Sequence, residues 1–138
     1  MMLRAIPTLA LLLAFAMAPA PRPAAGQDAA RADVETIDAI IIALYDVISG
    51  EAGEARDWDR FRSLFAPQAT LSPVGRNQRG EFGRRVMAPD TYVEQIAPFL
   101  EENGFVGAEI GRVTERYGEI AHAFSAYESY RSASDEEP

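Results

Sequence analysis

The sequence contains no cysteine and no lysine, and its 138 residues include a single histidine, His122. Without cysteine the chain forms no disulfide, so its stability has to come from its hydrophobic core. One histidine and no cysteine give no zinc spacing, and neither the DWD of residues 57–59 nor the DEE of residues 135–137 resembles a calcium loop. The sequence therefore predicts no metal ion and no other cofactor.

Basic residues are also few, since 13 Arg face 21 Asp and Glu and the formal net charge is −8. An acidic protein is poorly suited to nucleic acid, because phosphates have to be neutralised by basic side chains. It is repelled by anionic membrane surfaces for the same reason. The sequence thus predicts neither nucleic acid nor a membrane surface as the partner of the chain.

The first 26 residues have the three-part pattern of a secretory signal. Arg4 is followed by an apolar run from Ile6 to Met17 and then by small residues. A run of this length is shorter than the ~20 residues that a membrane-spanning helix needs. Ala24 and Gly26 form a cleavage site, so we expect cleavage near Gly26 and export to the periplasm or the medium. The alternative is a retained anchor or an amphipathic N-terminus.

Removal of this leader would take away two arginines, which leaves 11 Arg against 21 acidic residues and a formal charge of −10. We expect one domain over residues 27–131 and a loose acidic tail over 132–138.

Two helices are predicted at the start of this domain. Apolar residues recur at helical spacing over 33–48, with Asp33 as a good N-cap. Asp57 is the predicted N-cap of a short second helix, which Pro67 ends. A short strand is expected next, stopped by the Ser-Pro-Val-Gly turn of residues 72–75.

The segment from Arg76 to Asp90 reads as a loop rich in glycine and arginine. Its four arginines are either a lid for an anionic ligand or a solvated loop that faces the acidic helices; they are Arg76, Arg79, Arg84 and Arg85.

A third helix is predicted to begin at Pro89, to be kinked at Pro98 and to end at Asn103-Gly104. Two strand-like runs follow, with Gly118 suited to the tight turn between them. Helices first and strands last favour an α+β fold, with the helices on one face of a curved antiparallel sheet.

Four segments, taken in this order, resemble the nuclear transport factor 2-like superfamily, which includes SnoaL-like cyclases and ketosteroid isomerase. They read IIALYDVISG, DWDRFRSLFAPQATLSPVG, YVEQIAPFLEENGF and EIAHAFSAYES, within residues 33–131. The resemblance implies a cone-shaped barrel in which three helices pack on a curved antiparallel sheet and enclose a deep pocket. It also implies that the protein binds or transforms a small apolar molecule, and that a homodimer through the sheet is possible.

Two departures from the family bear on chemistry and on the fold. Ser72 stands where isomerase-like members carry a catalytic Asp, and a serine of ordinary pKa cannot replace that general base. Tyr45 lies about two positions out of register with the family's oxyanion tyrosine. The last two strands of the family's sheet are also absent, so the sheet is expected to be incomplete.

The predicted ligand-binding residues are Trp58, Ser72, Tyr92, His122 and Tyr127, and no catalytic residue is assigned. Each has a plainer alternative: the aromatic residues as core, Ser72 as a turn residue and His122 as a half-buried histidine of the sheet. Glu128 shares the face of His122 in a strand, but ~20 Å of strand separates the two residues, so they cannot touch.

Three functions follow from these residues. The first is an exported domain that binds a small apolar molecule without transforming it. The second is a lyase, isomerase or cyclase with His122 as acid and base. The third is a non-catalytic interaction module that dimerises through an unpaired strand edge.

Overall fold

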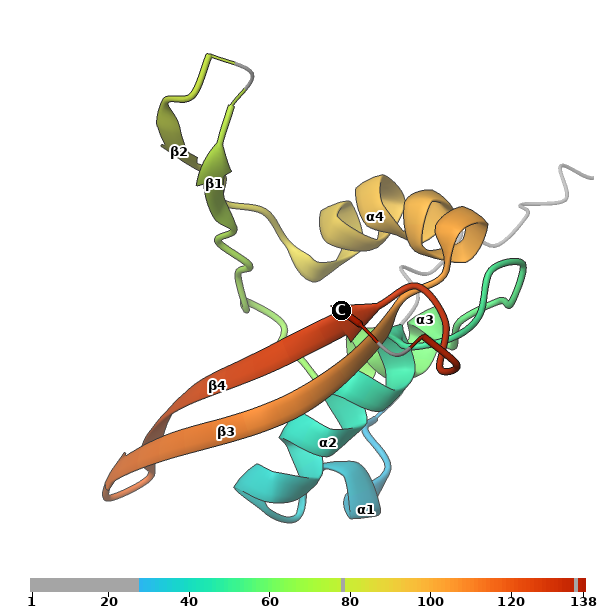
Figure 1. Cartoon of the computed structure of the whole chain (residues 1–138). Helices are drawn as coiled ribbons and strands as arrows, with labels where there is room; N and C mark the ends of the chain where they lie inside the picture. Colours follow the sequence, from blue (N-terminus) through green and yellow to red (C-terminus); the bar gives the residue numbers. More distant parts are fainter. Residues whose placement is uncertain (1–27, 78, 136) are drawn as a thin grey trace, which may run out of the picture.

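The computed structural model describes residues 28–77, 79–135 and 137–138, and the predicted leader lies outside these residues (Figure 1). The elements, in chain order, are α1 (Arg31–Val34), α2 (Ile37–Ile48), α3 (Trp58–Ser63), β1 (Val74–Arg76), β2 (Phe82–Arg84), α4 (Pro89–Asn103), β3 (Val106–Tyr117) and β4 (Ile120–Tyr130). The strands form two separate antiparallel pairs, β1 with β2 and β3 with β4. The predicted α+β class is therefore confirmed, and neither pair of strands is closed into a barrel.

The helix predicted over 33–48 is two helices. Thr36 has extended backbone angles, φ −140° and ψ 163°, and its hydroxyl accepts a 3.0 Å hydrogen bond from the N–H of Ala39 at the start of α2. Asp33 was predicted as the N-cap, and that prediction is wrong. Its carboxylate instead accepts two hydrogen bonds from the Arg60 guanidinium, at 2.8 and 2.9 Å, so it joins α1 to α3.

The start signals of the other two helices are confirmed, but α3 ends at Ser63 and not at Pro67. Asp57 caps α3 by accepting a 2.9 Å hydrogen bond from the N–H of Arg60. Pro89 opens α4, where its missing N–H costs no helical hydrogen bond. Gly104 ends α4 with φ +72°, a conformation that favours glycine.

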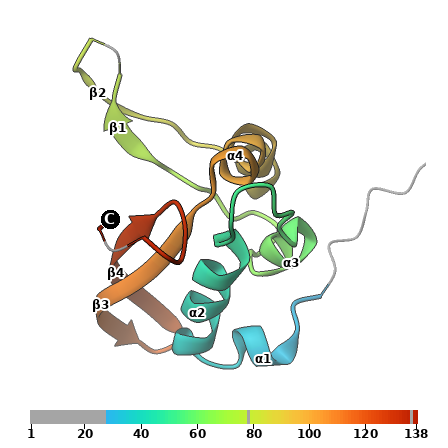
Figure 2. The ribbon, with the colours of Figure 1, turned by 45° about the vertical axis from the view of Figure 1, so that its right-hand side comes forward.

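The segment around Ser72 differs from its prediction. The expected strand is reduced to one bridge between Leu71 and Met87, and the Ser-Pro-Val-Gly residues lead into β1 rather than end a strand. The predicted loop from Arg76 to Asp90 contains β2, which pairs with β1 so that Gly75 faces Gly83. Residues 74–84, which we call the arm, project away from the rest of the chain (Figures 1 and 2).

Local side-chain contacts explain why the arm forms a hairpin. The side-chain oxygen of Asn77 accepts hydrogen bonds from the N–H groups of Arg79 and Glu81, at 2.9 and 3.0 Å, which folds the turn. The Arg76 guanidinium carbon lies 3.9 Å from the centre of the Phe82 ring across the two strands.

The long hairpin of β3 and β4 is confirmed, with Gly118 at its turn and φ +58°. Its register shifts between Glu109 and Gly111, which makes a β-bulge at Ile110. One face of the hairpin, which we call the inner face, contacts Tyr45 of α2 through Gly107, Ser125 and Tyr127. The opposite face, the outer face, carries Val113, His122, Phe124 and Ala126 by strand alternation.

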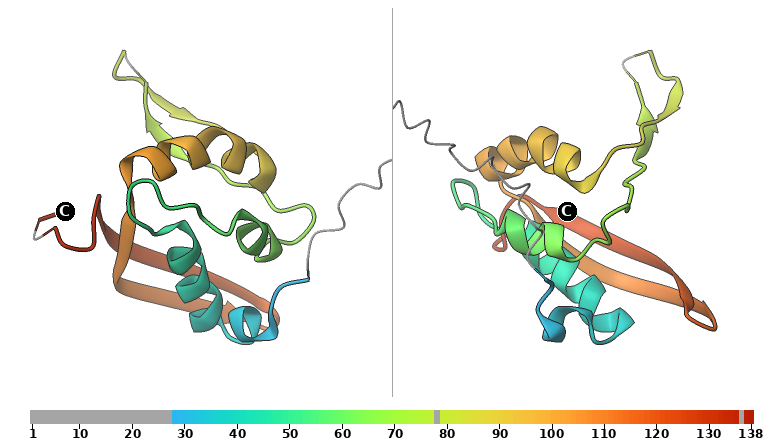
Figure 3. Two further views of the ribbon diagram at one scale, coloured as in Figure 1. Left: turned by 90° about the vertical axis from the view of Figure 1, so that its right-hand side faces the viewer. Right: turned by 180° about the vertical axis from the view of Figure 1, so that it is seen from behind.

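The core lies among the helices. Its buried cluster consists of Ala43, Val47, Phe61, Leu64 and Val93. Packing runs from β3 to α2, from α2 to α3 and from α3 to α4 (Figure 3). No hydrophobic residue of β3 or β4 is among the buried ones, so the described part of the hairpin borders this core without contributing to it.

Arg56 is a buried charged residue between the ends of α2 and α4, with 8% of its surface exposed. Its guanidinium donates to the carbonyl oxygens of Gly50, Glu51 and Leu100, at 2.5, 3.1 and 3.2 Å. The side chain therefore satisfies carbonyl groups near two helix ends at once.

Candidate functional site

Two of the predicted site residues pack on one side chain of the core. The Trp58 ring meets Phe61 edge to face at 5.8 Å, and the Tyr92 ring stacks on Phe61 at 5.5 Å. The indole N–H of Trp58 donates a 2.8 Å hydrogen bond to Glu101 of α4. Trp58 is thus held from both ends, by core packing and by a hydrogen bond, and has a structural role in joining α3 to α4.

Tyr92 is half-buried, and its hydroxyl, which makes no hydrogen bond with another described residue, is open to solvent. Burial raises the pKa of Tyr92 above its ordinary value, and the neighbouring Tyr127 raises it further. Tyr127 is 53% exposed, and its ring lies 5.8 Å from that of Tyr45. The structure therefore brings together three tyrosines from α2, α4 and β4, namely Tyr45, Tyr92 and Tyr127, which we call the tyrosine cluster.

The structure places the other two predicted residues elsewhere. Ser72 is exposed on the segment that leads to the arm. His122 lies on the outer face of the hairpin, where its side chain is 59% exposed and its ring contacts Phe124 at 4.3 Å. Its Nδ1 is 3.9 Å from a carboxylate oxygen of Glu115. An acid and base role for His122 at the tyrosine cluster would require its ring on the inner face.

Tyr45, Ser125 and Glu109 form a hydrogen-bonded chain on the inner face that no local sequence pattern predicts. The Tyr45 hydroxyl lies 2.9 Å from the Ser125 hydroxyl, which lies 2.5 Å from Glu109 Oε1. An ionised carboxylate can only accept hydrogen bonds. The Ser125 hydroxyl therefore donates its hydrogen bond to Glu109 and accepts one from the Tyr45 hydroxyl. The proton of the Tyr45 hydroxyl therefore points toward Ser125 and is not available to a ligand.

Arg112 holds the carboxylate at the end of this chain. Its guanidinium donates to both oxygens of Glu109, at 2.9 and 2.8 Å, and to Asp38 of α2 at 2.7 Å. The hydrogen bond from Arg112, followed by that from Ser125, lowers the pKa of Glu109 below its ordinary value. An ionised, paired carboxylate of this kind is a weak general base at neutral pH, because its affinity for a proton is reduced.

Sequence alternation gives no signal for this chain. Glu109 and Arg112 are three residues apart, so in a regular strand they would point to opposite faces. The bulge at Ile110 adds one residue and turns both side chains to the inner face. Tyr45 is 80 residues from Ser125, and no local pattern connects them.

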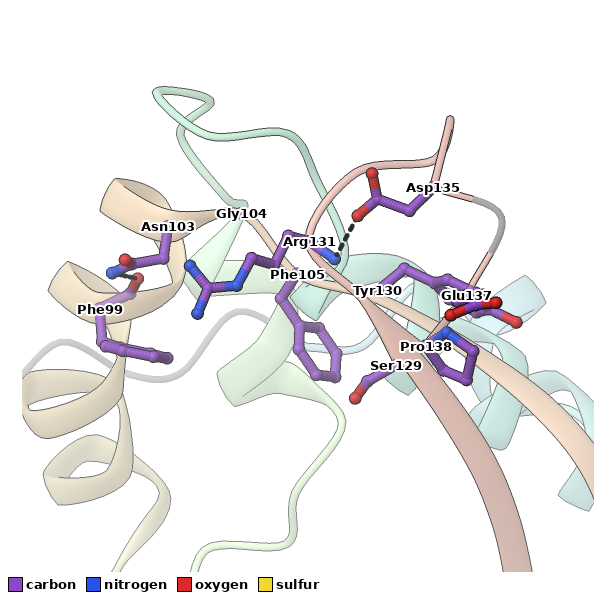
Figure 4. A pocket seen from close by; sticks show the side chains of 10 residues that line it. All are labelled: Phe99, Asn103, Gly104, Phe105, Ser129, Tyr130, Arg131, Asp135, Glu137 and Pro138. Carbon is purple, nitrogen blue, oxygen red and sulfur yellow. Dashed lines mark hydrogen bonds between the residues drawn. The ribbon is translucent and has the colours of Figure 1, made fainter.

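A hollow lies where α4 ends and the last described residues begin, with a volume of ≈ 380 Å³ (Figure 4). Phe99, Phe105 and Tyr130 line it together with Arg131 and Asn103. The carboxylates of Asp135 and Glu137 line it too, so its charge is mixed and favours neither an anion nor a cation.

Two further properties concern the described residues alone. They contain no group of three or more acidic or histidine side chains arranged to hold a metal ion. None of their helices has the length and apolar character required to cross a membrane.

Comparisons with protein-family models, with curated proteins and with solved structures each found no match to this chain. The nuclear transport factor 2-like resemblance therefore stays a prediction from the residues, and function has to be inferred from the geometry of the tyrosine cluster.

Proposed function

We propose that the chain is an exported, nuclear transport factor 2-like domain that binds a small, largely apolar molecule at the tyrosine cluster and does not transform it. The observation that carries this proposal is the hydroxyl of Tyr92. It lies half-buried beside Tyr127 and has no hydrogen-bond partner among the described residues. The hydroxyl is open to solvent, so it is free to donate a hydrogen bond to a ligand.

The tyrosine cluster offers both apolar area and hydrogen bonds to a ligand. Tyrosine rings supply apolar contact area, and binding sites typically combine such area with a few fixed polar groups. The Tyr45 hydroxyl donates its hydrogen bond to Ser125, so Tyr45 offers a ligand its ring and its remaining lone pair. Tyr92 and Tyr127 would then be the donors to a carbonyl or hydroxyl oxygen on an otherwise apolar molecule.

Binding without turnover is favoured by the acid and base groups at hand. The carboxylate on the inner face, Glu109, is paired with Arg112 and has a lowered pKa. Ser72 cannot serve as a general base at neutral pH. His122 lies on the other face of the hairpin from Tyr127.

The rest of the proposal concerns the fold and the compartment. The β1–β2 pair and the β3–β4 pair would be parts of one curved sheet in a cone-shaped barrel, with the tyrosine cluster facing its interior. The leader would be cleaved near Gly26 and the domain exported. A formal charge of −10 in the mature chain would keep it away from nucleic acids and anionic membranes.

Ligand titrations of matched variants test this function. Thermal shifts would be measured with a panel of steroids, aromatic ketones and apolar carboxylic acids, and the best binder titrated by calorimetry. Tyr92→Phe keeps the ring and removes the hydroxyl, so we expect about 5- to 10-fold weaker binding, the value of one hydrogen bond. Tyr117→Phe is the matched control, because Tyr117 is 87% exposed on the hairpin.

Three results would contradict the proposal. One is a panel in which no compound stabilises the protein. Another is a Tyr92→Phe variant that binds as tightly as the unmodified chain. The third is a compound that is consumed by the unmodified chain but not by His122→Ala, which would favour the enzyme with His122 as acid and base.

A further inference from the structure

The outer edge of β4 is an unpaired strand edge. In the described sheet β4 pairs with β3 alone, over the whole length from Ile120 to Tyr130. Tyr117 and Ile120 flank a two-residue turn, so the two residues exchange backbone hydrogen bonds. Because hydrogen-bonded pairs alternate along an antiparallel hairpin, the N–H and C=O groups of even-numbered β4 residues point to β3. The N–H and C=O groups of odd-numbered residues, with Ser125 at the centre, point outward and form a template for another strand.

Features that protect a strand edge are more numerous on β3 than on β4. β3 carries the bulge at Ile110 and four charged residues, which are Glu109, Arg112, Glu115 and Arg116. Charges and bulges on an edge discourage pairing with another chain. From Ile120 to Tyr127, β4 has neither an Asp, a Glu nor an Arg. The edge of β4 is thus the one that is chemically open to a further strand.

Two copies of β4 are complementary in one antiparallel register. A two-fold axis perpendicular to the sheet places a residue opposite itself, and the outward-pointing groups of Ser125 suit that position. With Ser125 opposite Ser125, His122 faces Glu128 of the second copy, and this pair occurs twice. Ile120 then faces Tyr130, and Phe124 faces Ala126. Shifting the axis to Phe124 would place Ile120 opposite Glu128 and lose the pairing of His122 with a carboxylate.

We propose that β4 pairs with β4 of a second copy of this chain in this register, which joins two hairpins into one four-stranded sheet. The pairing would also bring the exposed apolar side chains of the two outer faces side by side. Ile120 is 72% exposed and Phe124 is 63% exposed in the single chain. Each His122 lies between Glu115 of its own β3 and Glu128 of the second copy. This inference is independent of the ligand at the tyrosine cluster.

Sedimentation velocity of the purified chain over a dilution series tests the proposal. We expect a species of twice the chain mass that dissociates on dilution. Glu128→Arg replaces the carboxylate opposite His122 with a cation and should weaken the dimer at least 10-fold. Adding His122→Glu to this variant places a carboxylate opposite the new arginine in the same register and should recover the dimer. A monomer at every concentration, or an open-ended series of larger species, would overturn the proposal.

Two further variants test the edge and the register directly. Val113→Lys changes a 63% exposed residue of the same outer face on β3, away from the β4 edge, and should leave the dimer intact. If it dissociates the dimer as strongly as Glu128→Arg, the two copies pack face to face and the edge pairing is wrong.

Because the chain has no cysteine, Ser125→Cys should yield a disulfide-linked dimer on oxidation, while Thr114→Cys on β3 should not.

Discussion

The hydroxyl of Tyr45 on α2 lies 2.9 Å from the hydroxyl of Ser125 on β4, and this contact joins residues 80 positions apart. The Ser125 hydroxyl in turn donates a hydrogen bond to Glu109 of β3, so one hydrogen-bonded chain links α2 to both strands of the hairpin. Neither strand contributes a hydrophobic residue to the buried core of the described chain. The polar chain is therefore a main attachment of the hairpin to the helices.

Removing either hydroxyl of this pair should destabilise the protein by about 1 kcal/mol, the net value of one such hydrogen bond. The variants are Tyr45→Phe and Ser125→Ala, compared by urea unfolding. Because both act on one chain, the double variant should lose less than the sum, with a coupling of about 0.5 kcal/mol or more. Tyr117→Phe, on the exposed part of the hairpin, is the control and should change little. Strict additivity would show that the two hydroxyls are not coupled.

The carboxylate of Glu109 should make stability depend on pH. Hydrogen bonds from Arg112 and then Ser125 lower its pKa in the folded protein. A lowered pKa adds stability that is present above the unfolded value of about 4.3 and is lost as the pH falls through the folded value. Glu109→Gln should therefore be less stable than the unmodified chain at pH 7, and the gap should narrow below pH ~4.

Thermal unfolding from pH 7 to pH 3 measures this gap. Glu94→Gln, at an exposed position of α4, is the control and should change stability little at either end of the range. A gap between Glu109→Gln and the unmodified chain that stays constant across the range would mean that ionisation of Glu109 does not matter to folding.

Arg56 should be a strong determinant of stability. Arg56→Met keeps much of the side-chain volume but removes the guanidinium hydrogen bonds to the carbonyl groups of Gly50, Glu51 and Leu100. Each of these carbonyl groups keeps one backbone N–H donor. We expect a loss of about 3 kcal/mol in the free energy of unfolding, because several hydrogen bonds from one buried charged donor are lost together. Arg79→Met in the exposed arm is the matched control and should be near neutral. If both variants unfold at the same urea concentration, the buried hydrogen bonds of Arg56 contribute nothing.

The parts of the fold that the sequence predicts correctly depend on short-range signals. Asp57 caps the helix that begins with the next residue, Pro89 opens its own helix, and Gly118 forms the turn in which it lies. Each of these acts within a few residues, so a single sequence is enough to detect it. The α+β class follows from the order of such elements.

The predictions that are wrong concern residues whose local sequence signal is overridden by contacts formed in the folded chain. Asp33 is as good a cap as Thr36, but Arg60 binds its carboxylate from α3, which no local pattern reveals. In the arm, a glycine- and arginine-rich segment that resembles a loop pairs as strands because Asn77 folds the turn and Arg76 packs on Phe82.

The candidate site was predictable only in part. Tyr92 and Tyr127 were expected at the ligand, and the structure brings them close enough for Tyr127 to raise the pKa of Tyr92. The contribution of Tyr45 and Glu109 could not be foreseen, because it depends on the bulge that reverses strand alternation at Ile110.

Gly80 and Gly104 have similar positive φ angles but different surroundings. Gly104 has φ +72° and Gly80 has φ +78°, so alanine is strained at both positions. A Cβ at Gly104 would lie 2.2 Å from the carbonyl oxygen of Arg131, whereas a Cβ at Gly80 meets nothing within 4 Å. Gly80→Ala should cost about 1 kcal/mol, the strain alone. Gly104→Ala should cost at least about 3 kcal/mol, because its ψ of 152° adds to the strain and a backbone atom has to move as well. Urea unfolding of the two variants measures the difference, and equal losses would mean that residue 131 does not lie against the end of α4.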